Sequence, residues 1–222
     1  MEVIYEDNHI IAVNKRAGEI VQGDRTGDTP LSESVKAYLK EKYAKPGNVF
    51  CGVVHRIDRP VWGIVLFAKT SKALERLNRM FRDGEVHKTY WALVEGAPET
   101  PEAQLERYLV SDGRINKTFV SDVSNPEAKL SKLRYRTIAR GDRYSLLEVT
   151  LLTGRKHQIR AMLADIGHPV KGDLKYGARR SNRDGGISLQ AHSVEFIHPV
   201  SKQKISLEVD PLPDAARILE GE

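Results

Sequence analysis

The sequence has one cysteine and no long apolar run, and each shortage excludes a class of protein. With Cys51 alone, neither a disulfide nor a Cys-x-x-Cys metal motif can form within the chain. No stretch approaches the roughly 18 consecutive apolar residues of a membrane-spanning helix. Residues 1–7 are acidic and lack an apolar core, so they do not look like a secretory signal. A cytoplasmic globular protein without a membrane segment is the simplest expectation.

Several motifs of cofactor-dependent enzymes are also missing. There is no G-x-G-x-x-G and no G-x-x-x-x-G-K-[ST], so neither dinucleotide binding nor a P-loop is indicated. There is no H-E-x-x-H, and the seven histidines are scattered, so we expect no metal site. No serine lies in a G-x-S-x-G elbow. The sequence therefore predicts neither a metal nor a cofactor.

The composition is ordinary for a globular protein and slightly basic. Of the 222 residues, 40% are hydrophobic and 29% charged, and the formal net charge is +5. This length suits one large domain or two small ones. A mild excess of Lys and Arg permits an anionic partner such as RNA or DNA but does not require one.

The spacing of apolar residues predicts many strands and few helices. Strands are expected over 2–14, with a turn at 7–9, and over 86–96, 131–139, 144–152, 188–197 and 203–209. Helices are expected over 31–43, over about 71–82 with Thr70 or Ser71 as the cap, and after residue 157. Residues 97–130 look irregular and polar. The sum is a mixed α+β architecture without the regular alternation of a parallel nucleotide-binding sheet.

The segment His55-Arg56-Ile57-Asp58-Arg59-Pro60 carries the most chemical information. Arg56 and Arg59 flank Asp58 and favour its ionised form. An ionised aspartate can act as a nucleophile without a metal. Apolar runs on both sides, 52–54 and 63–68, predict buried strands, which would place the charges at a strand edge facing a cleft. The alternative is a surface charge cluster.

A second segment, Arg155-Lys156-His157, lies where a helix is expected to begin. Cations there oppose the positive end of the helix dipole, so local rules would favour acidic residues instead. Residues that break such a local preference tend to mark functional sites. The start of a helix with basic side chains can bind an anion such as a phosphate or a carboxylate. The hypothesis is an ion pair between Asp58 and Arg155 across the cleft; the alternative is an exposed turn with solvated cations.

Two further features are weaker on their own. Tyr90 lies on a predicted strand, where a tyrosine is usually part of the core. Arg179, Arg180 and Arg183 form a basic loop that suits phosphate contacts, although it could equally be solvated. A similar, weaker patch contains Arg134, Arg136, Arg140 and Arg143.

Four segments, in order, resemble the RluA family of RNA pseudouridine synthases. Residues 55–63 are similar to its HRLDRxTSG motif, and residues 5–15 to the start of its catalytic domain. Residues 88–94 resemble its KxYxALV strand, and residues 152–160 its TGRxHQIR motif. Segments 172–177 and 189–192 also fit, so the similarity spans nearly the whole chain.

This resemblance implies a fold and a reaction. The fold is a mixed, largely antiparallel sheet flanked by helices and loops with a central catalytic cleft, formed by one catalytic domain over residues 1–222. The reaction is isomerisation of a uridine in RNA to pseudouridine, without cofactor or metal. Asp58 matches the catalytic aspartate, Tyr90 the active-site tyrosine and Arg155 the basic partner of the aspartate.

The same resemblance and the basic segments give a set of expected substrate-binding residues: His55, Arg56, Arg59, Trp62, Lys156, His157, Arg160, Arg179 and Arg180. The family's Thr and Ser after the second arginine are Val61 and Trp62 here, and a bulky Trp62 could reshape the cleft or stack on a base. The S4 RNA-binding domain of many relatives is absent from the sequence. The catalytic domain is therefore expected to hold the RNA itself, as a stem-loop of ribosomal or transfer RNA.

Two rival functions remain open at this point. One is a catalytically inactive RNA-binding module on the same fold, against which the intact Asp58, Tyr90 and Arg155 argue. The other is a hydrolase with an aspartate nucleophile, such as a glycosidase, which usually needs a second carboxylate about 5 Å away. A monomer is the default expectation for the oligomeric state.

Overall fold

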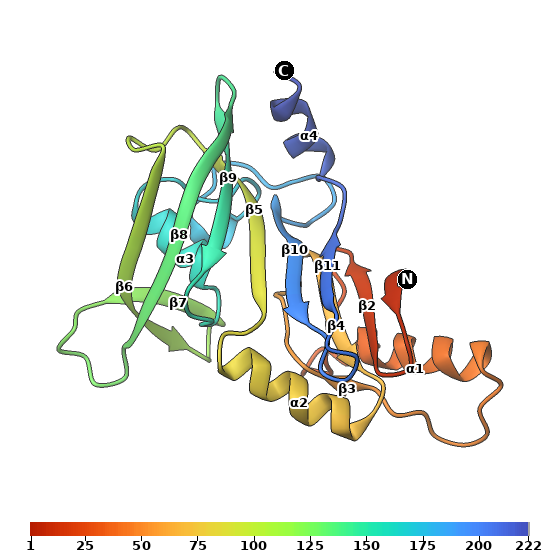
Figure 1. Ribbon diagram of the computed structural model, residues 1–222. Helices are drawn as coiled ribbons and strands as arrows, with labels where there is room; N and C mark the ends of the chain where they lie inside the picture. The colour runs from red at the N-terminus through yellow and green to blue at the C-terminus, as the bar shows by residue number, and fades with distance from the viewer. Residues whose placement is uncertain (222) are drawn as a thin grey trace. The chain divides into compact units, whose positions relative to one another are not determined.

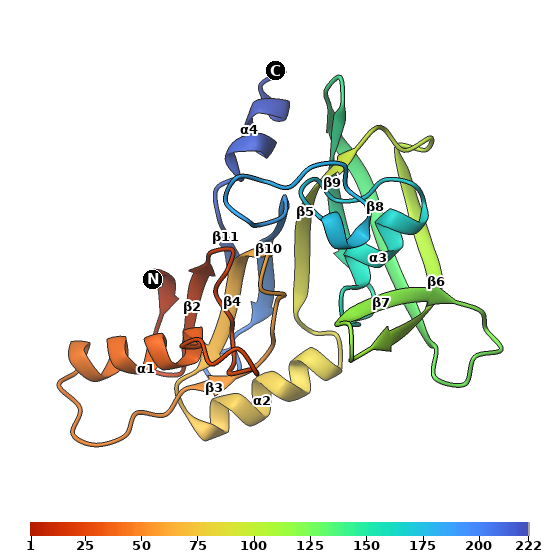
Figure 2. The same cartoon turned by 180° about the vertical axis from the view of Figure 1, so that it is seen from behind.

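A computed structural model describes residues 1–221, which fold into two compact units (Figures 1 and 2). Unit 1 contains Met1–Lys88 and Ala191–Asp210, and unit 2 contains Thr89–Gln190 and the chain from Pro211 onward. The boundaries fall within strands β5 (His87–Glu95) and β10 (Leu189–Ile197), so each of these strands contributes residues to both units. The expectation of a single domain over 1–222 stays a prediction.

Unit 1 is built on antiparallel strands. β1 (Glu2–Glu6) pairs with β2 (Ile10–Lys15), and β2 pairs with β4 (Trp62–Ala68). β10 follows β4 in the strand order, β11 (Lys204–Glu208) pairs with β10, and the short β3 (Gly52–Val53) pairs with β4. β2 and β4 are almost completely buried, which agrees with their continuous apolar runs. The predicted strands at 2–14, 188–197 and 203–209 are confirmed.

Two helices belong to unit 1, both where the spacing predicted them. α1 (Leu31–Lys42) buries Leu31, Val35 and Leu39, one residue per turn. α2 (Ser71–Arg82) begins at the cap Thr70, whose side chain accepts a hydrogen bond of 3.1 Å from the Ala73 amide. Ala73, Leu77 and Met80 of α2 pack against the strand residues of the unit 1 core, with Leu74 and Phe81 partly buried beside them.

Unit 2 contains a second antiparallel arrangement, in the order β5, β9 (Tyr144–Leu151), β8 (Lys129–Arg140), β6 (Glu102–Asp112) and β7 (Lys117–Ser121). Helix α3 (Gln158–Asp165) and the 3₁₀ turn η1 (Leu174–Tyr176) lie between β9 and β10 in the chain. The C-terminal helix α4 (Pro213–Leu219), which the sequence did not predict, packs Ala215 against Leu93 and Leu146.

The expectation that residues 97–130 are irregular is wrong. They contain β6 and β7, which form a hairpin. Only Leu105 and Leu109 of β6 expose less than a tenth of their surface. The other side chains of β6 are partly or fully exposed, so the apolar alternation that marks a strand is faint. The strand state here is set by pairing with β8 on one side and β7 on the other.

No helix within residues 1–221 has both the length and the apolar character needed to cross a membrane. The longest helices have 12 residues, against about 20 for a membrane span.

Gly63 tests how closely β4 and β10 approach within unit 1. Its φ is +109°, and a Cβ at this position would lie 2.3 Å from the Ala191 carbonyl oxygen. We expect Gly63→Ala to lower the free energy of unfolding by about 2–4 kcal/mol, because strain and a backbone clash coincide. Chemical denaturation measures the loss. Gly23→Ala, where the new methyl meets nothing within 4 Å, is the control, and equal midpoints for both variants would contradict the prediction.

Candidate active site

The Asp58 loop occupies the segment between β3 and β4 of unit 1, directly before a buried strand, as the sequence predicted. The Asp58 carbonyl accepts a hydrogen bond of 3.0 Å from the Val61 amide, which closes a tight turn over Arg59 and Pro60. Asp58 itself is half-buried. A side chain on a turn anchored to a rigid strand is well placed for chemistry.

A buried lysine holds this loop in place. Lys15 at the end of β2 is fully buried, and its ammonium donates hydrogen bonds to the carbonyls of Arg16 (2.9 Å), Arg59 (3.0 Å) and Val61 (2.7 Å). Burial lowers the pKa of Lys15 to about 8, and the negative charges of Glu19 and Asp58 oppose that change. Lys15 was not singled out from the sequence. The available signal was a lysine that continues the buried run Ile10–Val13.

The other expected substrate-binding residues near Asp58 differ in their surroundings. Arg56 is exposed. Arg59 donates a hydrogen bond of 2.8 Å to Thr26 Oγ1 and forms an ion pair with Asp28 in the polar loop of unit 1. The bond from Arg59 keeps the pKa of Asp28 below its usual range. Trp62 is half-buried at the start of β4.

His55 faces the interior of unit 1. Its Nε2 accepts a hydrogen bond of 3.0 Å from the Leu66 amide, and its ring stacks on Phe81 at 4.7 Å between centroids. Burial, with a smaller contribution from the Lys88 charge, lowers the pKa of His55 to about 3. A neutral imidazole packed in this way supports the strand that follows Asp58. This geometry favours a supporting role for His55 over the predicted contact with substrate.

The remaining expected catalytic residues belong to unit 2. Tyr90 is buried on β5 at a position that pairs with Val149 of β9, which confirms the predicted strand. Arg155 and Lys156 are exposed in the loop before α3, whose first residue is Gln158. The expectation that these cations precede a helix is confirmed.

The side chain of Gln158 fixes the loop that carries Arg155. Its Oε1 accepts hydrogen bonds from the Arg155 amide (3.0 Å) and the Thr153 hydroxyl (2.9 Å). Its Nε2 donates to the Lys132 carbonyl at 2.9 Å. Gln158 is 2% exposed, so this network is protected from water. Gln158 lies within the motif over residues 152–160, but the motif by itself does not predict this role.

His157 and Arg160, both expected to bind substrate, are buried beside Tyr176. His157 has a φ of +51°, and its Nδ1 lies 2.8 Å from the Tyr176 hydroxyl. Arg160 makes a bidentate ion pair with Asp173, at 2.6 and 2.9 Å, and its guanidinium lies 4.9 Å from the Tyr176 ring centre. Tyr176 and Asp173 were not predicted as site residues. They support the helix that follows the Arg155 loop.

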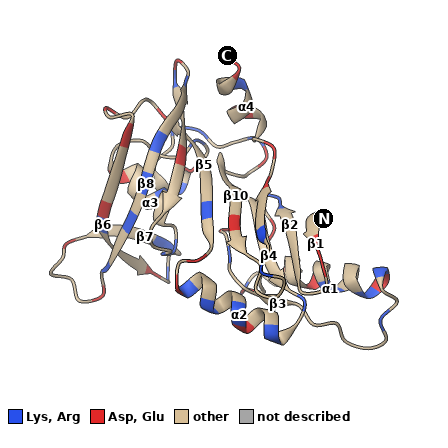
Figure 3. Cartoon of the chain, viewed as in Figure 1, with Lys and Arg blue, Asp and Glu red and all other residues tan. Residues whose placement is uncertain are grey.

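The two basic regions of unit 2 are unlike each other. Arg179 and Arg180 are exposed, and the Arg179 amide donates to Glu95 Oε1 at 2.8 Å. Basic segments of β8 lie beside acidic segments of its neighbouring strands (Figure 3), and Arg136 pairs with Glu148 at 2.9 Å. Arg179 also lies near an acid, Glu95, but at 3.6 Å and with a side chain that is 90% exposed. The patch around β8 is therefore a poorer candidate for RNA contact than the 179–180 loop.

Comparison with known sequences now defines the family. The profile described as RNA pseudouridylate synthase matches residues 9–165, which includes Asp58, Tyr90 and Arg155. The chain belongs to the RNA pseudouridylate synthase family. The resemblance of the four motifs to the RluA group is thereby confirmed.

Its curated relatives in the family carry names from two RNA classes. The chain is 30% identical to "tRNA pseudouridine synthase C" of Pectobacterium carotovorum subsp. carotovorum, over 94% of this chain and 58% of that protein. It is 33% identical to "Ribosomal large subunit pseudouridine synthase C" of Vibrio cholerae, over 92% of this chain and 64% of that protein. The chain thus spans about three fifths of the length of these two relatives.

Solved structures confirm the fold of this family member. "Human RNA Pseudouridylate Synthase Domain Containing 4" matches with a TM-score of 0.81 at 19% identity, over 99% of this chain and 92% of that chain. "Human RNA Pseudouridylate Synthase Domain Containing 1" matches with a TM-score of 0.73 at 21% identity, over 96% and 85%. The predicted mixed, largely antiparallel sheet with flanking helices is therefore correct, while the central cleft stays a prediction.

The buried state of His55 predicts an acid-sensitive stability. The unfolded chain takes up a proton on this residue below about pH 6.5, whereas the folded chain does so only near pH 3. The free energy of unfolding should therefore fall on acidification. From pH 6.5 to 5 the wild type should lose about 1–2 kcal/mol more than His55→Gln, which keeps an acceptor for the Leu66 amide. Denaturant titrations at several pH values measure this, and parallel curves for the two proteins would refute it.

The Arg160–Asp173 pair predicts a structural penalty. Arg160→Met would leave a buried carboxylate without its guanidinium and should cost about 3–5 kcal/mol of unfolding free energy. Lys36→Met, which removes an exposed pair with Glu33, should cost less than about 1 kcal/mol and is the control. Thermal and denaturant unfolding report both. An unchanged midpoint with loss of RNA binding would instead assign Arg160 to substrate contact.

Proposed function

We propose that this protein isomerises uridine to pseudouridine in structured RNA, with Asp58 as the nucleophile. The observation that carries the proposal is the family match over residues 9–165, in which the Asp58 motif falls on a turn held by a buried lysine. Two of the three hydrogen bonds from its ammonium, to the carbonyls of Arg59 and Val61, restrict the backbone of the turn directly after Asp58. Such restriction is what a nucleophile needs in order to stay in a reactive orientation.

The reaction sets clear demands on the residues. Uracil must be detached from C1′ of the ribose, rotated, and rejoined through C5. Asp58 can assist by attacking C1′, by adding to C6 of the ring, or by removing a ribose proton, and all three routes remain open. The target uridine must leave its stack, at a cost of a few kcal/mol.

Tyr90 and Arg155 are proposed to act on the same uridine. Tyr90 is buried on β5, a setting in which a phenol can stack on a base or pass a proton. Arg155 is proposed as the cationic partner of Asp58, and the Gln158 network presents it on an ordered loop. The family's role assignments for these residues support the proposal.

The RNA is proposed to be ribosomal or transfer RNA, the two classes that appear in the relatives' names. Among the residues predicted to bind it, Arg56, Lys156, Arg179 and Arg180 are exposed and suited to phosphates. Trp62, which replaces the family's Ser, is half-buried and suited to influence which uridine is accepted. A cytoplasmic location and a monomeric state stay predictions.

The test of the proposal is loss of the product with Asp58. Asp58→Asn should reduce pseudouridine formation by about 10³-fold or more while leaving RNA affinity within a few fold, because the carboxylate acts on the reacting atoms. The assay is carbodiimide labelling with primer extension on total RNA from cells that lack the protein and are complemented with each variant. Asp83→Asn, an exposed carboxylate of unit 1, is the matched control.

The possible results of this assay distinguish an active pseudouridine synthase from an inactive RNA-binding module. A site that is lost on deletion and restored by the wild type and Asp83→Asn, but not by Asp58→Asn, supports the proposal and identifies the substrate. Restoration by Asp58→Asn would remove Asp58 as the nucleophile. Absence of any lost site would favour the alternative, a catalytically inactive RNA-binding module on the same fold.

A further inference from the structure

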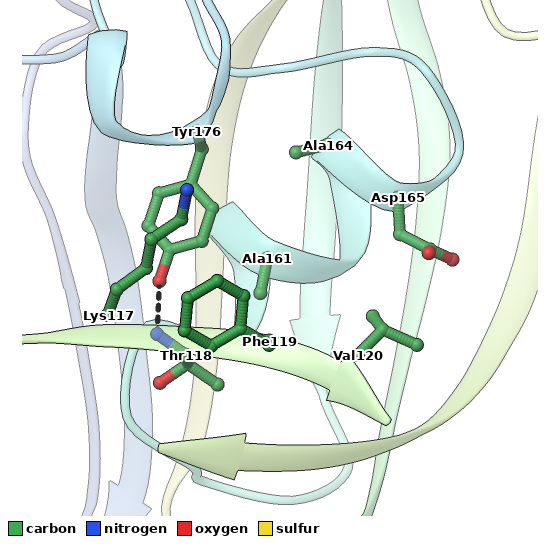
Figure 4. A pocket seen from close by; sticks show the side chains of 8 residues that line it. All are labelled: Lys117, Thr118, Phe119, Val120, Ala161, Ala164, Asp165 and Tyr176. Atoms are coloured by element: carbon green, nitrogen blue, oxygen red, sulfur yellow. Dashed lines mark hydrogen bonds between the residues drawn. The ribbon is translucent and has the colours of Figure 1, made fainter. Parts of the chain in front are cut away.

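A groove in unit 2 lies between β7 and α3 (Figure 4). One wall is formed by residues 117–120 of β7, the floor by Ala161 and Ala164 of α3, and one end by Tyr176. Its volume is about 290 Å³, close to the lower limit of about 300 Å³ for small-molecule sites. A groove of this size suits a single flat ring better than a whole extended ligand.

The wall of the groove exposes an aromatic ring beside a cation. Phe119 is 39% exposed, and the Lys117 ammonium lies 5.3 Å from the ring centres of both Phe119 and Tyr176. β7 is the last strand in the order of unit 2, and exposed apolar side chains on an edge strand are normally avoided because they promote aggregation. An exposed ring with an adjacent cation is, however, the arrangement on which single-stranded nucleic acids stack.

The edge of β7 is poorly suited to accept a peptide strand instead. The Thr118 amide, which such a strand would need as a donor, already donates a hydrogen bond of 2.8 Å to the Tyr176 hydroxyl. Addition of a strand depends on free main-chain groups along an edge. The observations therefore favour a ligand that stacks on the Phe119 ring over a peptide that hydrogen-bonds to the backbone of β7.

Charge around the groove also favours a polyanion. Asp165, which lines the groove, pairs with Arg107 at 2.6 Å. Asp112, opposite Lys117 on β6, pairs with Arg114 at 3.1 Å. Lys117 has no ion-pair partner within 4 Å in the part of the chain that the structure describes. The Lys117 ammonium can therefore neutralise a phosphate while the neighbouring Phe119 ring contacts the base.

The groove is connected to the loop of Arg155. The Tyr176 hydroxyl that binds the Thr118 amide also lies 2.8 Å from Nδ1 of His157, two residues after Arg155. One phenol thus joins the groove wall and the proposed catalytic loop within unit 2. RNA engaged at that loop would have its neighbouring nucleotides near the groove.

We propose that Phe119 and Lys117 form a stacking subsite for an unpaired nucleotide of the RNA substrate, outside the site that holds the reacting uridine. The Phe119 ring stacks on the base and Lys117 pairs with a phosphate. The proposal rests on the proposed function for the identity of its ligand, but stacking at Phe119 does not require that Asp58 be the nucleophile.

The test compares three substitutions of one side chain. Phe119→Ala and Phe119→Leu both remove the ring, and the leucine keeps an apolar side chain in the wall of the groove. Phe119→Tyr keeps a flat ring. Each is assayed for pseudouridine formation on in vitro transcribed 23S ribosomal RNA and on in vitro transcribed tRNAs. Phe50→Ala removes a phenylalanine of unit 1 with a similar exposure, 44% against 39%, and is the matched control.

We expect the alanine and leucine variants to raise KM about tenfold with kcat within twofold, and the tyrosine and Phe50 variants to match the wild type. Irradiation at 254 nm of the Asp58→Asn protein with the same RNAs should join a nucleotide to the peptide that contains Phe119. A wild-type KM for Phe119→Leu would overturn the proposal, because apolar packing alone would then suffice.

The cross-linking experiment distinguishes failure of the proposed function from failure of the proposed stacking subsite at Phe119. If the wild type forms no pseudouridine in either RNA, the proposed function fails, yet cross-links at Phe119 would still support an RNA subsite in the groove. If the wild type is active but cross-links appear only elsewhere and Phe119→Ala has a wild-type KM, the groove proposal fails and the proposed function stands. Capture of a protein at Phe119 in place of RNA would likewise overturn it.

Discussion

The proposed chemistry of unit 1 depends on one interaction, the contact of the buried Lys15 ammonium with three carbonyl oxygens. Two of these carbonyls, from Arg59 and Val61, belong to the turn that carries Asp58. A buried charge is costly unless it is well satisfied, and three short hydrogen bonds offset that cost here. Because the two bonds to Arg59 and Val61 hold the turn, movement of the loop would leave the ammonium without two of its three acceptors. The position of Asp58 is thus coupled to the core.

In unit 2, buried polar side chains likewise hold the loop that carries Arg155, but here they are uncharged. Gln158 uses both ends of its amide to hold residues 153–155, and Tyr176 bridges His157 and the edge of β7. Burial raises the pKa of Tyr176, so the phenol that accepts the Thr118 amide hydrogen bond carries no charge. Arg155 and Lys156 remain exposed on this scaffold. In both units, buried polar groups order the backbone so that neighbouring charged side chains can face outward.

Several side chains that look like substrate ligands in the sequence have partners within the protein instead. The cationic residues of a motif rich in Arg, Lys and His suggest phosphate binding, but Arg160 is paired with Asp173, and His55 is a neutral acceptor for a strand amide. Periodicity could not reveal this, because Asp173 is 13 residues from Arg160 and Leu66 is 11 residues from His55. The residue type specifies which bonds a group can make, and the fold decides which partners are within reach.

The sequence by itself determined most of the elements, the family, and the residues on which the proposed chemistry depends. Apolar spacing predicted α1, α2 and most strands, because those elements bury one face against a core. Four ordered motifs identified Asp58, Tyr90 and Arg155. Tertiary structure alone decided the hairpin of β6 and β7, the roles of Lys15, Gln158 and Tyr176, and the groove at Phe119. Each involves at least one contact between segments distant in the chain, such as β6 with β8, Lys15 with Arg59, Gln158 with Lys132 and Tyr176 with Thr118, which local pattern does not encode.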